Sequence, residues 1–157
     1  MLEVDRENNK GSPIRYERMS IEDIAFDRGQ FDIVISSLAF HYVRDFPQVV
    51  RKIGACLTDG GAFVFSLEHP IFTAYGTQDW YYGDDGKILH FPVDRYFYEG
   101  ERRAHFLGED IVKYHKTLTT YINSLLTNGF EIVNLVEPQP PAHMCRCRAW
   151  RTNCDGP

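Results

Sequence analysis

Apolar positions along the chain follow two different periods, and segments of the two kinds alternate. The clearest strand is the β-branched run at residues 31–36, which is bounded by polar residues. A run of this kind is typical of a sheet that is covered on both faces. Strands are predicted at four apolar runs, residues 14–19, 31–36, 62–67 and 130–136.

Helices are predicted where apolar residues recur at spacings of three and four. Asp45 can cap a helix that ends at Asp59-Gly60-Gly61, and its apolar stripe consists of Val49, Val50, Ile53, Cys56 and Leu57. A second stripe predicts a helix that begins at Leu118 and closes at Asn128. Residues 1–10 also have a helical pattern, but no capping residue precedes it, so we expect the chain to open within a helix.

Alternating helices and apolar strands with short connections predict an α/β fold with a mostly parallel sheet. Between residues 68 and 115 the periodicity fails, and Tyr, Trp, Gly and Asp become frequent. Because this is too long for a plain loop, we expect an inserted cap at about residues 70–115, between the third visible strand and the last helix. We place the domain at residues 1–144, and a separate tail at residues 145–157.

Composition and charge narrow the class of partner. The chain has 157 residues, 43% of them hydrophobic, and a net charge of −5. Nucleic acid is disfavoured as a partner because phosphate groups require a clustered basic surface. No apolar run approaches the roughly 18 residues of a membrane helix, and the first residues are unlike a secretory signal. We therefore expect a small-molecule substrate, no membrane partner and a cytoplasmic location.

The cysteines are unevenly placed: Cys56 stands alone, and three more lie in the last 13 residues. A disulfide framework would spread them through the chain. His143 and the three late cysteines have soft ligand types, but their spacing is not that of a common zinc site. We expect no metal site.

Ligands of an open parallel sheet bind at the carboxyl ends of its strands, so residues that follow strands carry the chemistry. Three segments meet this condition, Met19-Ser20-Ile21-Glu22, Ser36-Ser37-Leu38-Ala39-Phe40-His41-Tyr42 and Glu68-His69-Pro70-Ile71.

The order of these segments carries a family resemblance. The run from Phe31 to Val43, the following helix, Leu57-Thr58-Asp59-Gly60-Gly61 and the strand to Phe65 resemble class I S-adenosylmethionine-dependent methyltransferases. Within this class the chain is most similar to the small-molecule, type 11-like branch that has Glu-His-Pro-Ile after the next strand. The resemblance covers residues 1–144 and implies a Rossmann-like sheet and S-adenosylmethionine as cofactor.

The resemblance also implies roles for individual residues. Ser20 and Ile21 match the turn that receives the adenine, with Ser20 in place of the usual acid, so the hydrogen bond there lacks charge assistance. Ser36, Ser37 and Leu38 match the turn that lines the methionine and sulfonium end. His41 matches a polar residue facing the transferring methyl group.

Two elements of the family pattern are absent from this sequence: the glycine-rich turn after the first strand and the acidic residue that holds the ribose. Gly60-Gly61 precedes a strand instead of opening a helix and is no substitute. We therefore expect a partial domain, truncated at its N-terminus, that lacks roughly half of the family's cofactor contacts and is weak or inactive.

The last 13 residues depart from the family too. Residues 145–157 stand where the family usually has an acidic stretch, Leu-Arg-Arg-Pro and a last apolar strand. Residues 145–157 can be encoded by codons that, read in another frame, give an ending with this acidic stretch and Leu-Arg-Arg-Pro. We therefore expect that a frameshift created the tail.

Candidate chemistry has competing interpretations. His41 either contacts a ligand or packs against Tyr42. His69 is either a base, paired with Glu68 near the substrate, or part of a hydrogen-bonded turn. Trp80 and Tyr82 either line an apolar substrate pocket or form the interior of the cap.

Three functions remain open at this point. The first is methyl transfer from S-adenosylmethionine to a small molecule, with His41 and His69 as catalytic candidates. The second is a non-catalytic remnant or interaction module that self-associates through an exposed sheet edge. The third, a nicotinamide-dependent reductase, is weakened by the missing glycine turn and by the absence of a Tyr-x-x-x-Lys pair.

Overall fold

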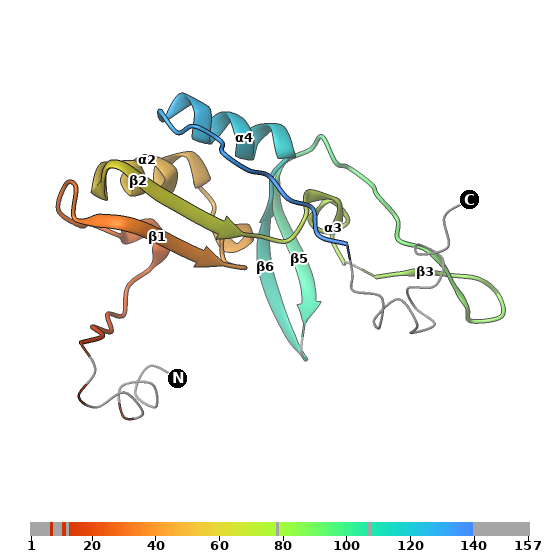
Figure 1. Ribbon diagram of the computed structural model, residues 1–157. Coiled ribbons are helices and arrows are strands. Elements are labelled where there is room, and N and C mark those ends of the chain that lie inside the picture. Colours follow the sequence, from red (N-terminus) through yellow and green to blue (C-terminus); the bar gives the residue numbers. More distant parts are fainter. Residues whose placement is uncertain (1–6, 8–10, 12, 78, 107, 140–157) are drawn as a thin grey trace.

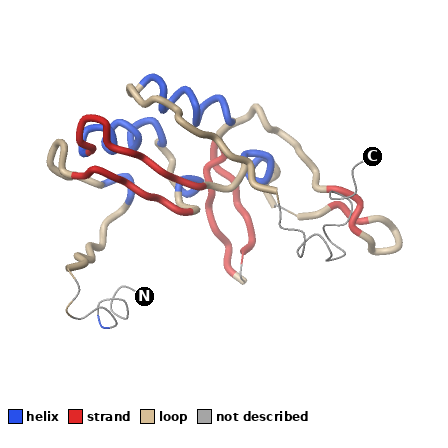
Figure 2. The backbone as a smooth tube through the Cα atoms, in the orientation of Figure 1, coloured by secondary structure: helices blue, strands red, loops and turns tan. Residues whose placement is uncertain are grey.

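The computed structural model describes residues 7, 11, 13–77, 79–106 and 108–139. Within these residues the strands form three separate pairs, one parallel and two antiparallel. Figure 1 shows the parallel pair at one end of the molecule, and Figure 2 shows a small hairpin at the opposite end. No helix in the described part of the chain is long and apolar enough to cross a membrane.

The parallel pair consists of β1 (Phe31–Ser37) and β2 (Leu57–Ser66). Their register shifts between Phe31 and Ile33, which pair with Leu57 and Ala62. Gly60, with φ of 77°, lies in the extra length of β2 and takes a left-handed conformation that a side chain would disfavour. The expected helix end at Asp59-Gly60-Gly61 is therefore wrong: the helix ends earlier, and these residues belong to the strand.

Helix α2 (Phe46–Cys56) connects the two strands and follows the short 3-10 helix η2 (Phe40–Tyr42). As predicted, Asp45 caps α2, with its side chain accepting a hydrogen bond from the Gln48 N–H at 2.9 Å. A parallel pair joined through a helix is the α/β unit that the sequence predicts.

The core lies between this unit and α4 (Leu118–Thr127). Phe46 is fully buried and meets the ring of Tyr121 edge-to-face, with 4.8 Å between centroids. Strand side chains alternate across the sheet: those that pack on the core are Val34, Phe63 and Phe65. On the other face the exposed apolar side chains are Ile33, Ile35 and Val64.

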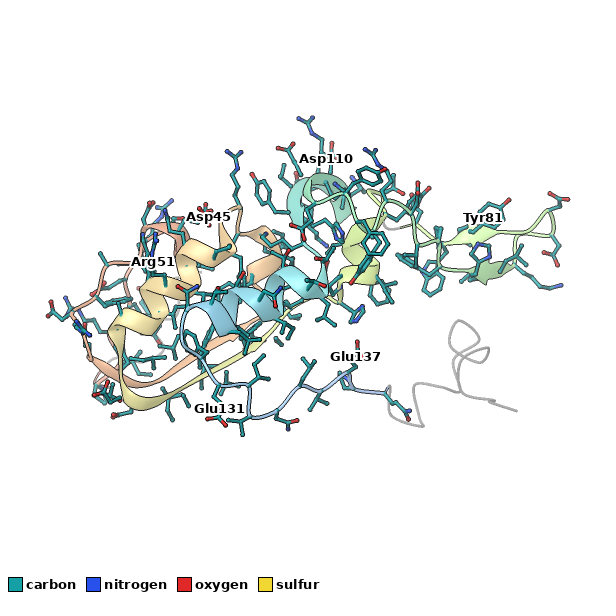
Figure 3. The ribbon with its side chains drawn as sticks, turned by 90° about the horizontal axis from the view of Figure 1, so that it is seen from above. Asp45, Arg51, Tyr81, Asp110, Glu131 and Glu137 are labelled. Atoms are coloured by element: carbon teal, nitrogen blue, oxygen red, sulfur yellow. The ribbon has the colours of Figure 1, made fainter. Side chains whose placement is uncertain are left out.

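Residues 70–115 form a helix and two hairpins between β2 and α4. The helix is α3 (Pro70–Ala74). The first hairpin joins β3 (Tyr81–Tyr82) to β4 (Ile88–His90), and Figure 3 shows Tyr81 on it, far from α2. The second hairpin, β5 (Gly100–Phe106) and β6 (Glu109–His115), stands beside the carboxyl ends of β1 and β2 in Figure 1.

Two predicted strands are not found. Residues 14–19 have no strand partner in the described part of the chain, and Ile14 and Met19 are exposed. Residues 130–136 run alongside β2 in Figure 1 without forming a ladder with it. Phe130 and Ile132 pack against the core while Val133 is 91% exposed. The alternation is present in both segments, but a strand also requires a neighbour that pairs with its backbone.

Two other expectations fall on residues that are not described. The helix at residues 1–10 lies outside the described residues except for Glu7, and the tail at 145–157 lies wholly outside them.

Candidate active site

The carboxyl ends of β1 and β2 meet at one edge, as a parallel register requires. The hydroxyl oxygens of Ser37 and Ser66 lie 3.4 Å apart there. The Leu38 N–H donates to the Ser66 backbone oxygen at 2.9 Å and also lies 3.3 Å from the Ser66 hydroxyl oxygen. Leu38 has a φ of 50°, which is uncommon for a residue with a side chain. Strained backbone of this kind is concentrated at ligand sites.

A buried cluster of charged and polar groups lies just beyond this edge. Lys113, on β6, donates from Nζ to both carboxylate oxygens of Glu68, at 2.6 and 2.8 Å. His41, on η2, accepts a hydrogen bond at Nδ1 from the Glu68 N–H at 3.4 Å. The other ring nitrogen, Nε2, lies 3.9 Å from Glu68 Oε1. Glu68, which follows β2, thus contacts both η2 and β6.

The electrostatic environment of His41 favours the neutral form of its ring. Its side chain is 2% exposed, and burial is the main cause that lowers the pKa of His41 below its ordinary value. The Glu68 carboxylate opposes this shift, while Lys113 and Lys116 reinforce it. A neutral imidazole can donate a hydrogen bond from one nitrogen and accept one at the other.

Lys116 is a second buried lysine beside the cluster. Its Nζ donates to the Val43 backbone oxygen at 2.5 Å and to the Tyr114 backbone oxygen at 3.2 Å. Burial lowers the pKa of Lys116 to about 8. Its contacts with backbone oxygens tie the end of β6 to η2.

His69 lies at the start of α3, with both ring nitrogens in contacts. Nδ1 accepts from the Ile71 N–H at 3.2 Å, which caps the helix. Nε2 lies 2.5 Å from the Glu137 carboxylate. A role as a base would require that one of these contacts break, and it stays a prediction.

Comparison with known proteins shows the family to which this chain belongs. A family model of the methyltransferase domain matches residues 1–65. The crystal structure of a proposed S-adenosylmethionine-dependent methyltransferase from Listeria monocytogenes is 48% identical. It aligns with a TM-score of 0.82 over 90% of this chain and 67% of that one. The chain belongs to the S-adenosylmethionine-dependent methyltransferases.

Two further proteins are similar to this chain. An S-adenosylmethionine-dependent methyltransferase from Mesorhizobium loti is 36% identical, with a TM-score of 0.83 over 92% of this chain and 66% of that one. An uncharacterized protein of Haemophilus influenzae is 33% identical over 131 residues, which are 80% of this chain and 52% of that protein. This methyltransferase chain spans about half the length of that curated relative.

The expected adenine turn of the methyltransferase is a 3-10 helix, η1 (Ile21–Asp23). The Ser20 hydroxyl accepts from the Glu22 N–H at 3.2 Å and so caps this helix. Glu22 accepts from the N–H groups of Arg44 and Asp45, which links η1 to the start of α2. An adenine contact through the Ser20 hydroxyl would share an oxygen that already caps η1.

The described residues could hold one part of this family's cofactor, its methionine end. The left-handed Leu38 leaves backbone groups and small Ser37 and Ser66 side chains at the strand edge, where a methionine end can approach closely. The sequence has no glycine-rich turn opening a helix, whose backbone N–H groups would hold the cofactor's carboxylate. In the described part of the chain, no group of three or more His, Cys, Asp and Glu is arranged to hold a metal ion.

The predicted substrate residues separate into two groups. Glu68 is in the buried cluster, whereas Trp80 packs edge-to-face on Phe91 at 5.4 Å between ring centroids. Phe91 in turn contacts Phe72 of α3 at 4.9 Å. Tyr82 lies on β3 with 54% of its surface exposed. The ring contacts of Trp80, Phe91 and Phe72 therefore join the first hairpin to α3.

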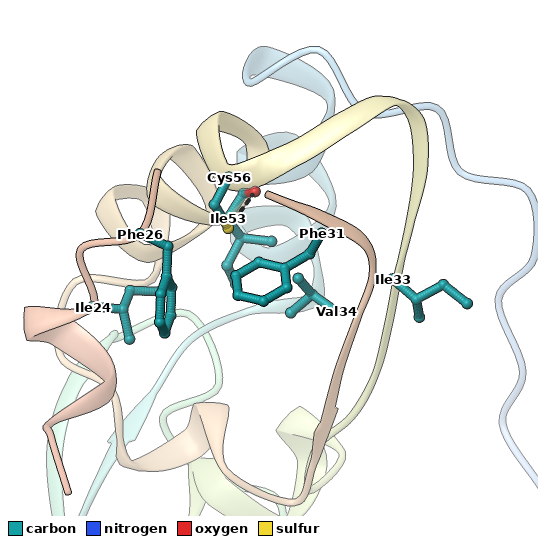
Figure 4. A pocket seen from close by; sticks show the side chains of 7 residues that line it. All are labelled: Ile24, Phe26, Phe31, Ile33, Val34, Ile53 and Cys56. Carbon is teal, nitrogen blue, oxygen red and sulfur yellow. Dashed lines mark hydrogen bonds between the residues drawn. The ribbon is translucent and has the colours of Figure 1, made fainter. Parts of the chain in front are cut away.

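An open apolar pocket lies away from the strand edge, between η1, β1 and α2, as Figure 4 shows. Its lining residues are Ile24, Phe26, Phe31, Ile33, Val34, Ile53 and Cys56. The buried Cys56 thiol is free, and its Sγ donates to the Ile53 backbone oxygen at 3.2 Å.

Sequence reasoning missed Lys113, Lys116 and His115. Lysine is rarely buried without a partner, and these residues lie in a segment whose periodicity predicts no regular element. The signal in the sequence is that Lys113 and His115 are two positions apart and so lie on the same face of a strand. Which way this face points depends on the β5–β6 hairpin, which the sequence does not reveal.

Proposed function

We propose that this chain takes part in methyl transfer from S-adenosylmethionine to a small molecule, at the carboxyl ends of β1 and β2. The observation that carries the proposal is the meeting of His41, Glu68 and Lys113 beside the strained turn at Leu38. Ligands of open α/β sheets bind at this edge. A cytoplasmic location stays an expectation from the sequence.

In this proposal the turn at Ser36, Ser37 and Leu38 lines the methionine end of the cofactor, and Ser20 with Ile21 receives the adenine. The bound cofactor supplies a methyl group already activated by its sulfonium. His41 stands near the methyl group, and Glu68 with its neighbours orients the acceptor. Trp80 and Tyr82 select the substrate through the hairpin. Because the methyl group is activated, alignment and exclusion of water are the main tasks of the protein.

Isothermal titration calorimetry with S-adenosylmethionine tests the proposal. We expect weak binding that Ser37→Phe abolishes, because the larger side chain fills the strand edge. Asp32→Phe, at the opposite end of β1, is the matched control and should leave the affinity unchanged. Absence of binding to the unmodified chain, or equal affinity of the two variants, would overturn the proposed cofactor site.

A second candidate, a self-associating interaction module, is favoured by a different observation. In the described part of the chain β1 pairs with β2 alone. The outer face of this pair exposes Ile33, Ile35 and Val64. Parallel sheets are normally covered on both faces, so association with a second copy would bury apolar surface. Sedimentation velocity at increasing concentration distinguishes a self-associating chain from a monomer.

A further inference from the structure

Lys113 is a buried charge whose contacts set the position of a second residue. Its side chain is 2% exposed, and it holds both oxygens of a carboxylate that is itself 27% exposed. Such a pair is costly to desolvate and is weak evidence for stability. Its two-point geometry does, however, fix the orientation of Glu68.

Glu68 contacts both edges of the His41 ring. Its backbone N–H donates to Nδ1, so in the neutral ring the proton lies on Nε2. Its carboxylate oxygen Oε1 lies 3.9 Å from that same Nε2. The orientation of the carboxylate therefore decides how strongly it acts on the ring.

The neighbouring histidines have both ring nitrogens in contacts. His69 contacts the Ile71 N–H and Glu137. His115 contacts Thr73 and the Tyr96 backbone oxygen. With His41 protonated on Nε2, the oxygen atoms of Glu68 are the proton-accepting group that this cluster places at the strand edge.

We propose that Lys113 is a positioning residue that fixes the Glu68 carboxylate beside Nε2 of His41, so that Glu68, and not a histidine, accepts the proton of the methyl acceptor. The acceptor is then a neutral N–H or O–H group. The nitrogen or oxygen of the acceptor bonds to the methyl carbon, and the electrons of the broken carbon–sulfur bond stay on sulfur. The proton of the acceptor's N–H or O–H group passes to Glu68. The reaction rests on the proposed function, whereas the positioning rests on contacts of this chain alone.

The test is a double-mutant cycle read from the His41 ring by NMR titration of the full chain with ¹⁵N-labelled histidine. Charged or titratable groups facing His41 are Glu68 after β2, Lys113 and Lys116 at β6, and Tyr42 on η2. Glu68→Gln removes the carboxylate and should lower the pKa of His41 by about one unit. In the Lys113→Met background the same substitution should lower it by less than half as much, because the carboxylate is no longer held beside the ring.

Three controls make the cycle decisive. Lys113→Arg keeps the positive charge and should restore the full effect of Glu68→Gln. Lys52→Met, which removes a lysine that contacts the Glu22 backbone oxygen on η1, should leave that effect unchanged. If Lys113→Met does not fold, Lys113→Gln removes the charge while keeping a hydrogen-bond donor.

Equal effects of Glu68→Gln in all backgrounds would overturn the positioning role, because purely additive charges give that result. A proton found on Nδ1 of His41 in the unmodified chain would overturn the assignment of Glu68 as proton acceptor. Neither readout requires cofactor. Failure to bind S-adenosylmethionine would therefore contradict the proposed function and the proton transfer to Glu68, and would leave the positioning role of Lys113 standing.

Discussion

At the residue scale, two histidines, His41 and His115, are buried in surroundings that favour their neutral form. His115 is fully buried, and its Nε2 lies 2.8 Å from the Tyr96 backbone oxygen. Because a carbonyl only accepts, Nε2 carries a proton, and in the neutral ring Nδ1 then accepts from the Thr73 hydroxyl at 2.8 Å. Burial is the main cause that lowers the pKa of His115 below its ordinary value of 6.5. This residue therefore links folding to pH.

We predict that the chain loses stability as the pH falls below about 6.5, where unfolded histidine begins to bind protons. The folded-state pKa of His115 is lowered, so the unfolded chain binds more protons than the folded chain in this range. His115→Gln should reduce the loss between pH 7 and pH 5. Asn123→Gln, an exchange of one neutral side chain for another at an exposed position of α4, should leave it unchanged. Urea unfolding at each pH measures the effect, and identical pH dependence in both variants would contradict it.

At the scale of elements, α2 combines a polar cap with an apolar stripe. The Asp45 carboxylate satisfies one N–H of the first turn, while Glu22 accepts from the N–H groups of Arg44 and Asp45 just before it. On its inner face, Phe46 contacts the rings of Phe40 and Tyr121. Loss of either feature should destabilise the connection between β1 and β2.

For the cap, we predict that Asp45→Ala lowers the free energy of unfolding by about 1 kcal/mol. Asp45→Asn should cost less, since an amide oxygen can still accept from the Gln48 N–H. Urea titration of the three proteins at pH 7 gives the comparison, and equal losses for Ala and Asn would argue against capping as the cause.

For the core, we predict that Phe46→Ala lowers the free energy of unfolding by about 3–5 kcal/mol, because it leaves a cavity between η2, β2 and α4. Phe97 is 86% exposed and offers the matched control. Phe97→Ala should stay within about 0.5 kcal/mol of the unmodified chain. Similar losses for both substitutions would place Phe46 outside the core.

At the scale of the whole molecule, the residues that the structure describes cover the parallel pair on one face only. Phe63 and Phe65 stack at 4.8 Å between ring centroids on the covered face, whereas Ile35 is 73% exposed on the other. An apolar face of this kind in water favours association.

We predict that the chain self-associates and that Ile35→Lys shifts it towards the monomer without lowering its stability. A charge on this face opposes burial against a second copy. Leu89→Lys, on the distant hairpin at a position 55% exposed, should leave association unchanged. Sedimentation velocity measures both, and a monomer at every concentration of the unmodified chain would contradict the prediction.

The elements that the sequence predicts correctly are those with local signals. The stripe and the Asp45 cap identify α2, and the β-branched run identifies β1, because both patterns depend on neighbours in the chain. The strands expected at residues 14–19 and 130–136 have the same local alternation, but strand pairing depends on a distant partner. At the site, His41 and Glu68 were predicted by their place after strands, whereas Lys113 was not.

The sequence by itself therefore determined the α/β class and the helix between β1 and β2, since the order and spacing of apolar runs specify them, and its motifs resemble the family that the comparisons show. Only the tertiary structure decided that β6 carries Lys113 to Glu68 and His41. This contact joins residues 45 positions apart. Its geometry follows from how the β5–β6 hairpin packs across the ends of β1 and β2, for which no periodicity along the chain gives a signal.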